Sequence, residues 1–248
     1  DSTEFLQAAL DAAARFTTVP QRKVFVQSMV DDSARANHTY GMNTPWVSRP
    51  LVVHSNTTLE LAVGVQLWAK RGEFHGNGDS MLTLTDVSNV NLVGYGASIT
   101  MHKADYASAN YSQSEYRNCI RLFSVTHVSI SGLLLRRSGG DGIGIFGQQR
   151  FFHNGSYDRD ALTFSRDVLI KDVVCSDNYR TGLAVTAAVD LVVEDSLFEL
   201  TTGTPPMAGV DIEPDTAGNK LQNISFVRCT TRSNYEQGWN LSPDAQTR

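Results

Sequence analysis

Short runs of alternating aliphatic residues recur along most of the chain, separated by turns rich in Gly, Asn, Asp and Ser. Alternation with a period of two predicts β-strands, because successive side chains of a strand point to opposite faces. Almost no segment beyond residue 20 has the 3.6-residue period of a helix, so the pattern predicts an all-β protein. The expected strands are Lys23–Val26, Leu51–Val53, Thr58–Leu61, Met81–Leu84, Val90–Val93, Ile120–Phe123, Val128–Ile130, Val168–Ile170, Leu191–Val193 and Ile224–Val227.

Internal repetition favours a solenoid over a β-sandwich. Within Ser138–Asp215, three segments each place a glycine before a strand with aliphatic residues at alternate positions: Gly139–Ile145, Arg180–Val185 and Met207–Glu213. The reference glycine recurs at 142, 182, 209 and 238, at intervals of 40, 27 and 29. The shorter intervals suit one coil each, and the longer one requires an inserted loop at 146–164. A second insertion is expected at about 102–118.

The first 20 residues predict a cap for one end of the solenoid. Apolar residues recur at helical spacing as far as Phe16, Asp1, Ser2 or Thr3 can serve as N-cap, and Pro20 ends the pattern. We therefore expect a single domain over residues 1–248, with 1–20 as an N-terminal cap helix. No comparable cap follows the last coil before Arg248, so either the natural protein continues or a partner covers that end.

Aligned coils place polar residues in outward-facing columns. One column contains Thr83, Arg121, Gly144, Ala184, Asp211 and Asn240, and a second contains Thr85, Phe123, Phe146, Thr186, Glu213 and Ser242. A third, just before the strand, contains Asn118, Asp141, Thr181, Ala208 and Gln237. Gly144 and Ala184 are expected to form a floor about 14 Å long between Arg121 and Asp211, enough for a few sugar rings.

Candidate catalytic residues are Asp211, Glu213 and Asp141. The Cα atoms of Asp211 and Glu213 should lie about 6.6 Å apart on one face, nearer the separation of inverting than of retaining glycosidases. One carboxyl can then act as general acid and the other as a base that activates water. The competing interpretations are solvated or cation-binding acids for the pair and a turn-capping role for Asp141.

Candidate substrate-binding residues surround this face: Arg121, Tyr179, Arg180, Glu115, Arg117 and His153. Arg180 is also a candidate base for a lyase. A surface ion pair is the alternative for Glu115 and Arg117, and a plain loop position for His153. Asn178 and Asn234, four residues before their reference glycines, are expected to bond backbone groups between coils.

Composition and charge limit the partners that this protein can bind and the cellular compartment in which it is expected. The net charge of −5 argues against nucleic acid or an anionic membrane surface as the main partner, and no apolar run is long enough to span a bilayer. The histidines and cysteines lack metal-ligand spacing, so no metal site is predicted, and the three cysteines are expected to be unpaired core residues. Six Asn-x-Ser/Thr sequons favour a secreted protein carrying N-linked glycans: Asn37, Asn56, Asn110, Asn154, Asn223 and Asn240.

Several segments resemble the pectin-lyase-like right-handed parallel β-helix superfamily: Ser2–Asp11, Pro50–Leu61, Val93–Ala97, Ser138–Ile143 and Ala208–Pro214. The resemblance implies a single right-handed parallel β-helix and a carbohydrate-active protein, with the subfamily unassigned. The superfamily includes hydrolases, lyases, epimerases and non-catalytic adhesins. The chain lacks the paired Asp-Asp, Gly-His-Gly and Arg-x-Lys set of polygalacturonases, and it has no clear calcium-dependent pectate lyase signature.

The leading hypothesis is therefore a secreted glycoside hydrolase that acts on a polysaccharide and needs no cofactor. The first alternative is a non-catalytic extracellular structural or adhesive glycoprotein. The second is a polysaccharide lyase or epimerase, for which calcium would be a plausible cofactor to neutralise a uronate.

Overall fold

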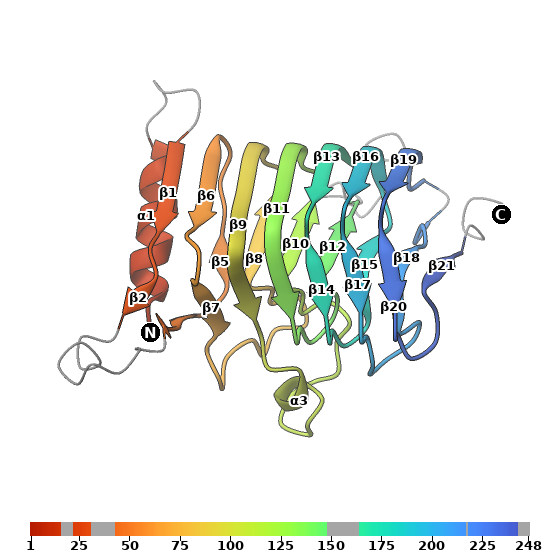
Figure 1. Ribbon diagram of the computed structural model, residues 1–248, viewed down its shortest axis with the longest axis horizontal. Helices are drawn as coiled ribbons and strands as arrows, with labels where there is room; N and C mark the ends of the chain where they lie inside the picture. Colours follow the sequence, from red (N-terminus) through yellow and green to blue (C-terminus); the bar gives the residue numbers. More distant parts are fainter. Residues whose placement is uncertain (16–21, 31–42, 148–163, 217, 243–248) are drawn as a thin grey trace, which may run out of the picture.

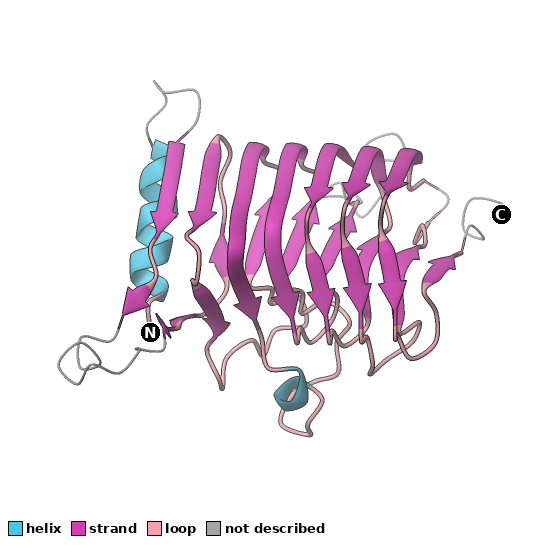
Figure 2. Ribbon diagram, in the orientation of Figure 1, coloured by secondary structure: helices cyan, strands magenta, loops and turns pink. Residues whose placement is uncertain are grey.

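The computed structural model describes residues 1–15, 22–30, 43–147, 164–216 and 218–242 as strands wound into successive coils, preceded by one long helix (Figures 1 and 2). The helix α1 (Thr3–Arg15) lies beside the first coil at the N-terminal end. A short helix, α3 (Lys103–Tyr106), lies beyond the lower edge of the coils as Figure 1 is drawn.

Two large parallel sheets make up the described part of the coils. The larger has twelve strands: β1 (Arg22–Val26), β4 (Trp46–Ser48), β6 (Thr57–Leu61), β7 (Gln66–Ala69), β9 (Ser88–Thr100), β11 (Thr126–Arg136), β13 (Ser165–Lys171), β14 (Val174–Ser176), β16 (Ala188–Glu194), β17 (Leu197–Glu199), β19 (Leu221–Val227) and β20 (Thr230–Arg232). The second has seven: β5 (Leu51–Val52), β8 (Leu82–Thr85), β10 (Ile120–Phe123), β12 (Ile143–Phe146), β15 (Thr181–Val185), β18 (Ala208–Ile212) and β21 (Trp239–Leu241). A separate antiparallel pair joins β2 (Met29–Val30) to β3 (Asn43–Thr44). This arrangement confirms the predicted parallel β-helix.

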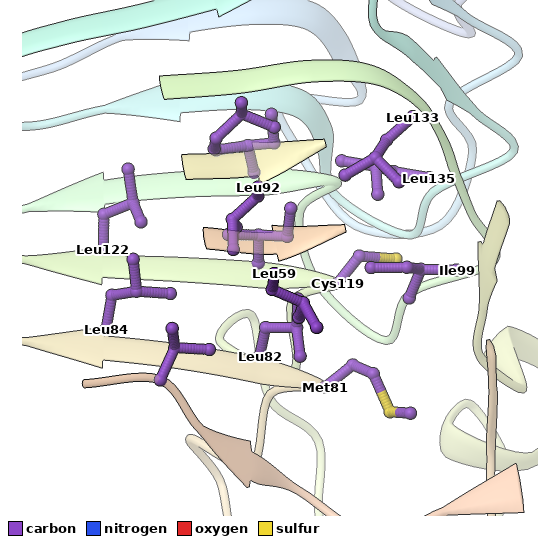
Figure 3. Close-up of a cluster of buried hydrophobic side chains, with 14 of the residues drawn as sticks. Leu59, Met81, Leu82, Leu84, Leu92, Ile99, Cys119, Leu122, Leu133 and Leu135 are labelled. Atoms are coloured by element: carbon purple, nitrogen blue, oxygen red, sulfur yellow. The ribbon is translucent and has the colours of Figure 1, made fainter. Parts of the chain in front are cut away.

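The core lies between the two large sheets. Equivalent positions stack from coil to coil: Leu59 pairs with Leu92 in the larger sheet, and Leu84 pairs with Leu122 in the second. All four side chains are at most 4% exposed and belong to one hydrophobic cluster (Figure 3). Repetition of aliphatic residues at the inward positions therefore produces one continuous core along the solenoid axis.

The reference glycines are required by the close approach of neighbouring coils. A Cβ atom on Gly142 would lie 2.6 Å from the carbonyl oxygen of Gly182, and one on Gly182 would lie 2.5 Å from that of Gly209. Both distances are shorter than van der Waals contact, so any larger residue would push the coils apart. The glycine column is thus a packing requirement at this corner of the coil.

Asparagines at the next corner fasten one coil to another, as predicted. The side-chain oxygen of Asn178 accepts a hydrogen bond from the backbone N–H of Ser138 at 3.1 Å, and its NH₂ group donates to the Leu135 carbonyl at 3.5 Å. Asn234 does the same for the Thr201 N–H and the Phe198 carbonyl. Each amide satisfies backbone groups that the turn would otherwise leave unpaired.

The helix α1 covers the apolar end of the first coil through Leu6, Leu10 and Ala13. The carboxylate of Asp1 accepts a hydrogen bond from the Thr3 N–H at 3.0 Å, which caps the helix start. Phe5 is apolar but 79% exposed, because it lies off the buried face. The predicted end at Phe16 lies outside the described residues. All three cysteines are free thiols, as expected.

Candidate active site

The first predicted outer column has the predicted register, and the pairs of the other two columns that lie within strands agree with it. Arg121 pairs with Thr83 and Gly144, and Ala184 pairs with Gly144 and Asp211. The expected open floor is wrong, however. Gly144 is buried beneath the Phe146 ring, which lies 2.3 Å from where a Cβ would stand, and Ala184 is 1% exposed.

Four carboxylates converge on the guanidinium of Arg180, immediately before β15. Its Nη1 lies 3.5 Å from Asp141 Oδ1, and its Nη2 lies 3.2 Å from Asp211 Oδ2 and 3.8 Å from Glu213 Oε2. Its Nε lies 3.3 Å from Glu115 Oε2. We call these five residues the Arg180 cluster. The structure therefore brings together the three predicted catalytic carboxyls and two of the predicted substrate-binding residues.

The cluster has a buried layer and an exposed layer. The side chains of Asp141 and Asp211 are 1% and 2% exposed, although they belong to columns that face away from the core. Those of Glu115 and Glu213 are 46% and 45% exposed. Arg180, at 14%, lies between the two layers. A ligand at this surface would thus meet the two glutamates first.

Neighbouring coils fix the buried carboxyls. The Thr181 hydroxyl donates to Asp141 Oδ1 at 2.7 Å, and the Asp141 backbone N–H donates to Asn118 Oδ1 at 2.9 Å. The Asn240 NH₂ group donates to Asp211 Oδ1 at 2.8 Å. Among the described residues, Asp141 Oδ2 is buried without a hydrogen-bond partner.

Burial perturbs the protonation of the cluster. Desolvation raises the pKa of Asp141 to about 6, against the lowering effect of Arg180 and the Thr181 hydrogen bond. Burial also raises the pKa values of Asp211 and Glu213, and Asp211 adds to the rise at Glu213. Burial alone would lower the pKa of Arg180, but the carboxylates, led by Asp141, outweigh it and raise that pKa. The cluster therefore combines a fixed cation with three carboxyls whose pKa values are raised above the ordinary values of their side chains.

No protein-family model matches this chain, and no curated protein matches its sequence. Solved structures match it in fold. One is a crystal structure from Parabacteroides merdae whose description as a glycosyl hydrolase is provisional, at a TM-score of 0.64 and 15% identity, covering 97% of this chain and 92% of that one. The shared fold is a right-handed parallel β-helix.

Two iota-carrageenase structures match the same right-handed β-helix. One, in complex with iota-carrageenan fragments, has a TM-score of 0.64 at 15% identity, and the match covers 92% of this chain and 45% of that one. The other, from A. fortis, has a TM-score of 0.59 at 14% identity, with 93% and 45% covered. The chain thus spans less than half the length of these enzymes, and the likeness extends to the fold alone.

Two predicted substrate-binding arginines serve the β-helix itself. Arg117 is completely buried, and its guanidinium donates to the carbonyls of Phe74, His75 and Ser112. This burial contradicts the expectation that Arg117 contacts substrate. The side chain of Arg117 is held by these backbone carbonyls and not by an ion pair with Glu115. Arg121 donates to the Gly78 carbonyl at 2.9 Å and stacks 4.3 Å from the Phe123 ring centre.

Other predicted residues lie apart from the cluster. Tyr179 lines a separate pocket, and its ring lies against Gly203. His153, Asn37 and Asn154 lie outside the described residues. Asn110 and Asn223 are exposed and Asn56 is half-buried, whereas the amide nitrogen of Asn240 is engaged by Asp211.

Two residues near the cluster were not predicted. Asp215, whose pKa is raised by burial, continues the period-two series of Asp211 and Glu213, and that alternation was the available signal. Tyr116, beside Glu115, is 45% exposed, and its ring meets the Phe146 ring edge-on at 6.0 Å. Its position within the predicted insertion at about 102–118 gave no comparable signal.

In the part of the chain that the structure describes, no group of three or more His, Cys, Asp or Glu side chains is arranged to hold a metal ion. Within the same residues, no helix has the length and apolar character needed to cross a membrane.

Proposed function

We propose that this protein is a secreted, polysaccharide-active enzyme that hydrolyses glycosidic bonds at the Arg180 cluster. The observation that carries the proposal is the pair of exposed carboxyls, Glu115 and Glu213, placed against one arginine that is 14% exposed and charge-paired. A pair of carboxyls on a rigid scaffold, one of them with a raised pKa, is typical of acid–base catalysis.

Glu213 is the proposed general acid, and Glu115 is the proposed base that activates water. Glu213 has the raised pKa that a proton donor needs. Its Oε2 atom and that of Glu115 lie 3.8 and 3.3 Å from two nitrogens of one guanidinium. The two oxygens are therefore at most about 9.5 Å apart, which is compatible with the inverting mechanism.

Asp141 and Asp211 are then positioning residues rather than proton carriers to substrate. Both are buried under Arg180 and hold its guanidinium between the two glutamates. Arg180 in turn orients Glu115 and Glu213 and keeps part of their charge balanced. The exposure of Glu213 and the burial of Asp211 favour this division over acid–base catalysis by the Asp211–Glu213 pair.

A hydrolase fits the charges better than a lyase or epimerase. Arg180 is surrounded by carboxylates that raise its pKa, which opposes a role as a neutral base. Its guanidinium also occupies the space between the carboxylates that a neutralising calcium ion would need. One cation against four carboxyls leaves no excess positive charge for a uronate at this point.

The test is a panel of neutral and acidic polysaccharides, assayed for new reducing ends and for the ultraviolet absorbance of unsaturated products. We expect reducing ends without absorbance, and a loss of at least about 100-fold in rate for Glu213→Gln and for Glu115→Gln. Glu194→Gln is the matched control, because Glu194 is a half-buried carboxylate paired with Lys171 on the other sheet. Full activity in both glutamate variants would contradict the proposal, and inactivity of the wild type on every polymer would favour a structural or adhesive glycoprotein.

Secretion and N-glycosylation are part of the same proposal. Asn110 is the best-placed described sequon, because it is exposed on the loop between β9 and β10. Asn240 is the poorest, because a glycan on its amide would remove the hydrogen bond to Asp211. Glycosidase treatment followed by mass spectrometry of protein secreted from eukaryotic cells tests this order.

A further inference from the structure

A pocket lies beside α3, and its lining includes Tyr179, the residue before Arg180, but not Arg180 itself. It encloses about 630 Å³, within the range of pockets that hold small organic ligands. We call it the flank pocket. Its walls come from β7, the end of β9, α3 and the turns at 137, 177–179 and 202–203. All of its lining residues lie in the described part of the chain.

Cationic side chains predominate around the flank pocket. Arg71, Lys103 and Arg137 face two acids, Asp105 and Asp177, which gives a formal excess of one positive charge. His102 also lines the pocket, and burial lowers its pKa, so it is neutral at pH 7. The flank pocket is therefore opposite in sign to the Arg180 cluster.

Two of these cations are free to change partners. Arg71 and Arg137 are 68% and 58% exposed, and each pairs with a single carboxylate, Asp105 or Asp177. Exposed pairs of this kind are worth little, so either guanidinium can turn to a bound anion at low cost. Arginine also presents paired N–H groups that match a carboxylate or a sulfate.

The rest of the pocket is tied by hydrogen bonds and partly aromatic. The Lys103 ammonium, 15% exposed, is held by Asp177 at 2.8 Å, by the Asn178 carbonyl and by the Thr202 hydroxyl at 2.7 Å. Trp68 and Tyr179 are among the lining residues. Aromatic residues beside exposed arginines and a lysine held by three partners suit a ring that carries a negative group.

We propose that the flank pocket binds an anionic sugar unit, with Arg71 and Arg137 holding its carboxylate or sulfate and Trp68 and Tyr179 packing against its ring. The site is separate from the Arg180 cluster and does not require that cluster to be catalytic.

Calorimetric titration with three trisaccharides tests the proposal: tri-galacturonate, a sulfated galactotriose and uncharged galactotriose. We expect at least one anionic trisaccharide to bind at least ten times more tightly than the uncharged one, and the two anionic arms identify whether the group is a carboxylate or a sulfate. Binding should weaken as salt is raised, because the arginines are exposed.

The variant R71Q/R137Q should weaken anionic binding at least tenfold. R228Q/R232Q is the matched control, because both of its arginines are similarly exposed and paired with single carboxylates on the larger sheet. Equal binding of charged and uncharged trisaccharides, no binding of either anion at millimolar concentration, or unchanged affinity in R71Q/R137Q would each overturn the proposal. Trp68→Ala supplies a second measurement, since loss of the ring should weaken binding without changing its salt dependence.

Discussion

Arg180→Gln should destabilise this protein in a strongly pH-dependent manner. Arg180 balances two carboxylates that are at most 2% exposed, Asp141 and Asp211, at 3.5 and 3.2 Å. Removal of one partner from a buried ion pair typically costs about 3–5 kcal/mol. Because Arg180 is 14% exposed and water can partly replace it, we expect the lower value, about 3 kcal/mol at pH 7.

The loss should shrink as the pH falls. The folded-state pKa of Asp141, about 6, lies above the ordinary aspartate value of 3.8. A raised carboxyl pKa contributes stability at low pH that is lost as the pH rises through about 6. Without Arg180 the pKa of Asp141 rises further, because Arg180 lowers it in the wild type. Protonation of Asp141 at low pH therefore removes more of the cost of its buried charge in the variant than in the wild type. At pH 4.5 we expect a difference of only about 1 kcal/mol, the packing contribution of the arginine stem.

Urea unfolding followed by far-ultraviolet circular dichroism, at pH 7 and at pH 4.5, measures both differences. Arg228→Gln is the control, because Arg228 pairs with Asp195 at the exposed surface. The pKa of Asp195 is lowered, chiefly by its hydrogen bond to Arg228, so that pair should contribute equally at both pH values. An Arg180→Gln loss of the same size at both pH values would refute the electrostatic reasoning and leave packing as the explanation.

Further substitutions test the coil geometry and the buried polar groups. Gly142→Ala should cost about 1–3 kcal/mol and lower the melting temperature, since its Cβ would lie 2.6 Å from the Gly182 carbonyl oxygen; an unchanged melting temperature would show that the coils can separate. Asn178→Ala should cost about 1–3 kcal/mol in urea unfolding, because it leaves buried backbone groups of the adjacent coil unpaired, and a neutral effect would mean that water replaces the amide. Arg117→Met should speed limited proteolysis between residues 102 and 118, because three backbone carbonyls lose their donor; an unchanged cleavage rate would contradict that role. Asp141→Asn should flatten the dependence of unfolding free energy on pH between about 4 and 7, since it removes the group with the raised pKa, and a wild-type slope would assign that dependence to other acids.

The sequence by itself determined the coil register and the polar columns. Strand side chains alternate with a period of two, so the positions of Val210 and Ile212 in the core assigned Asp211 to the outer face. The glycine column and the turn asparagines could be aligned for a related reason. Each occupies a corner where the next coil approaches closely, and few other residues fit there.

Only the tertiary structure decided what each outward position does. Alternation predicts which face of a strand a side chain occupies, but not whether other residues cover that face. Asp211 therefore points outward and is still only 2% exposed. Arg180 and Arg117 differ in role because their long side chains follow partners from other coils and loops, which local sequence does not specify. The flank pocket combines residues as far apart as Trp68 and Gly203. Local alternation determined the strands and their register, whereas the burial and the charge environment of each site arose from contacts between segments that are distant in sequence.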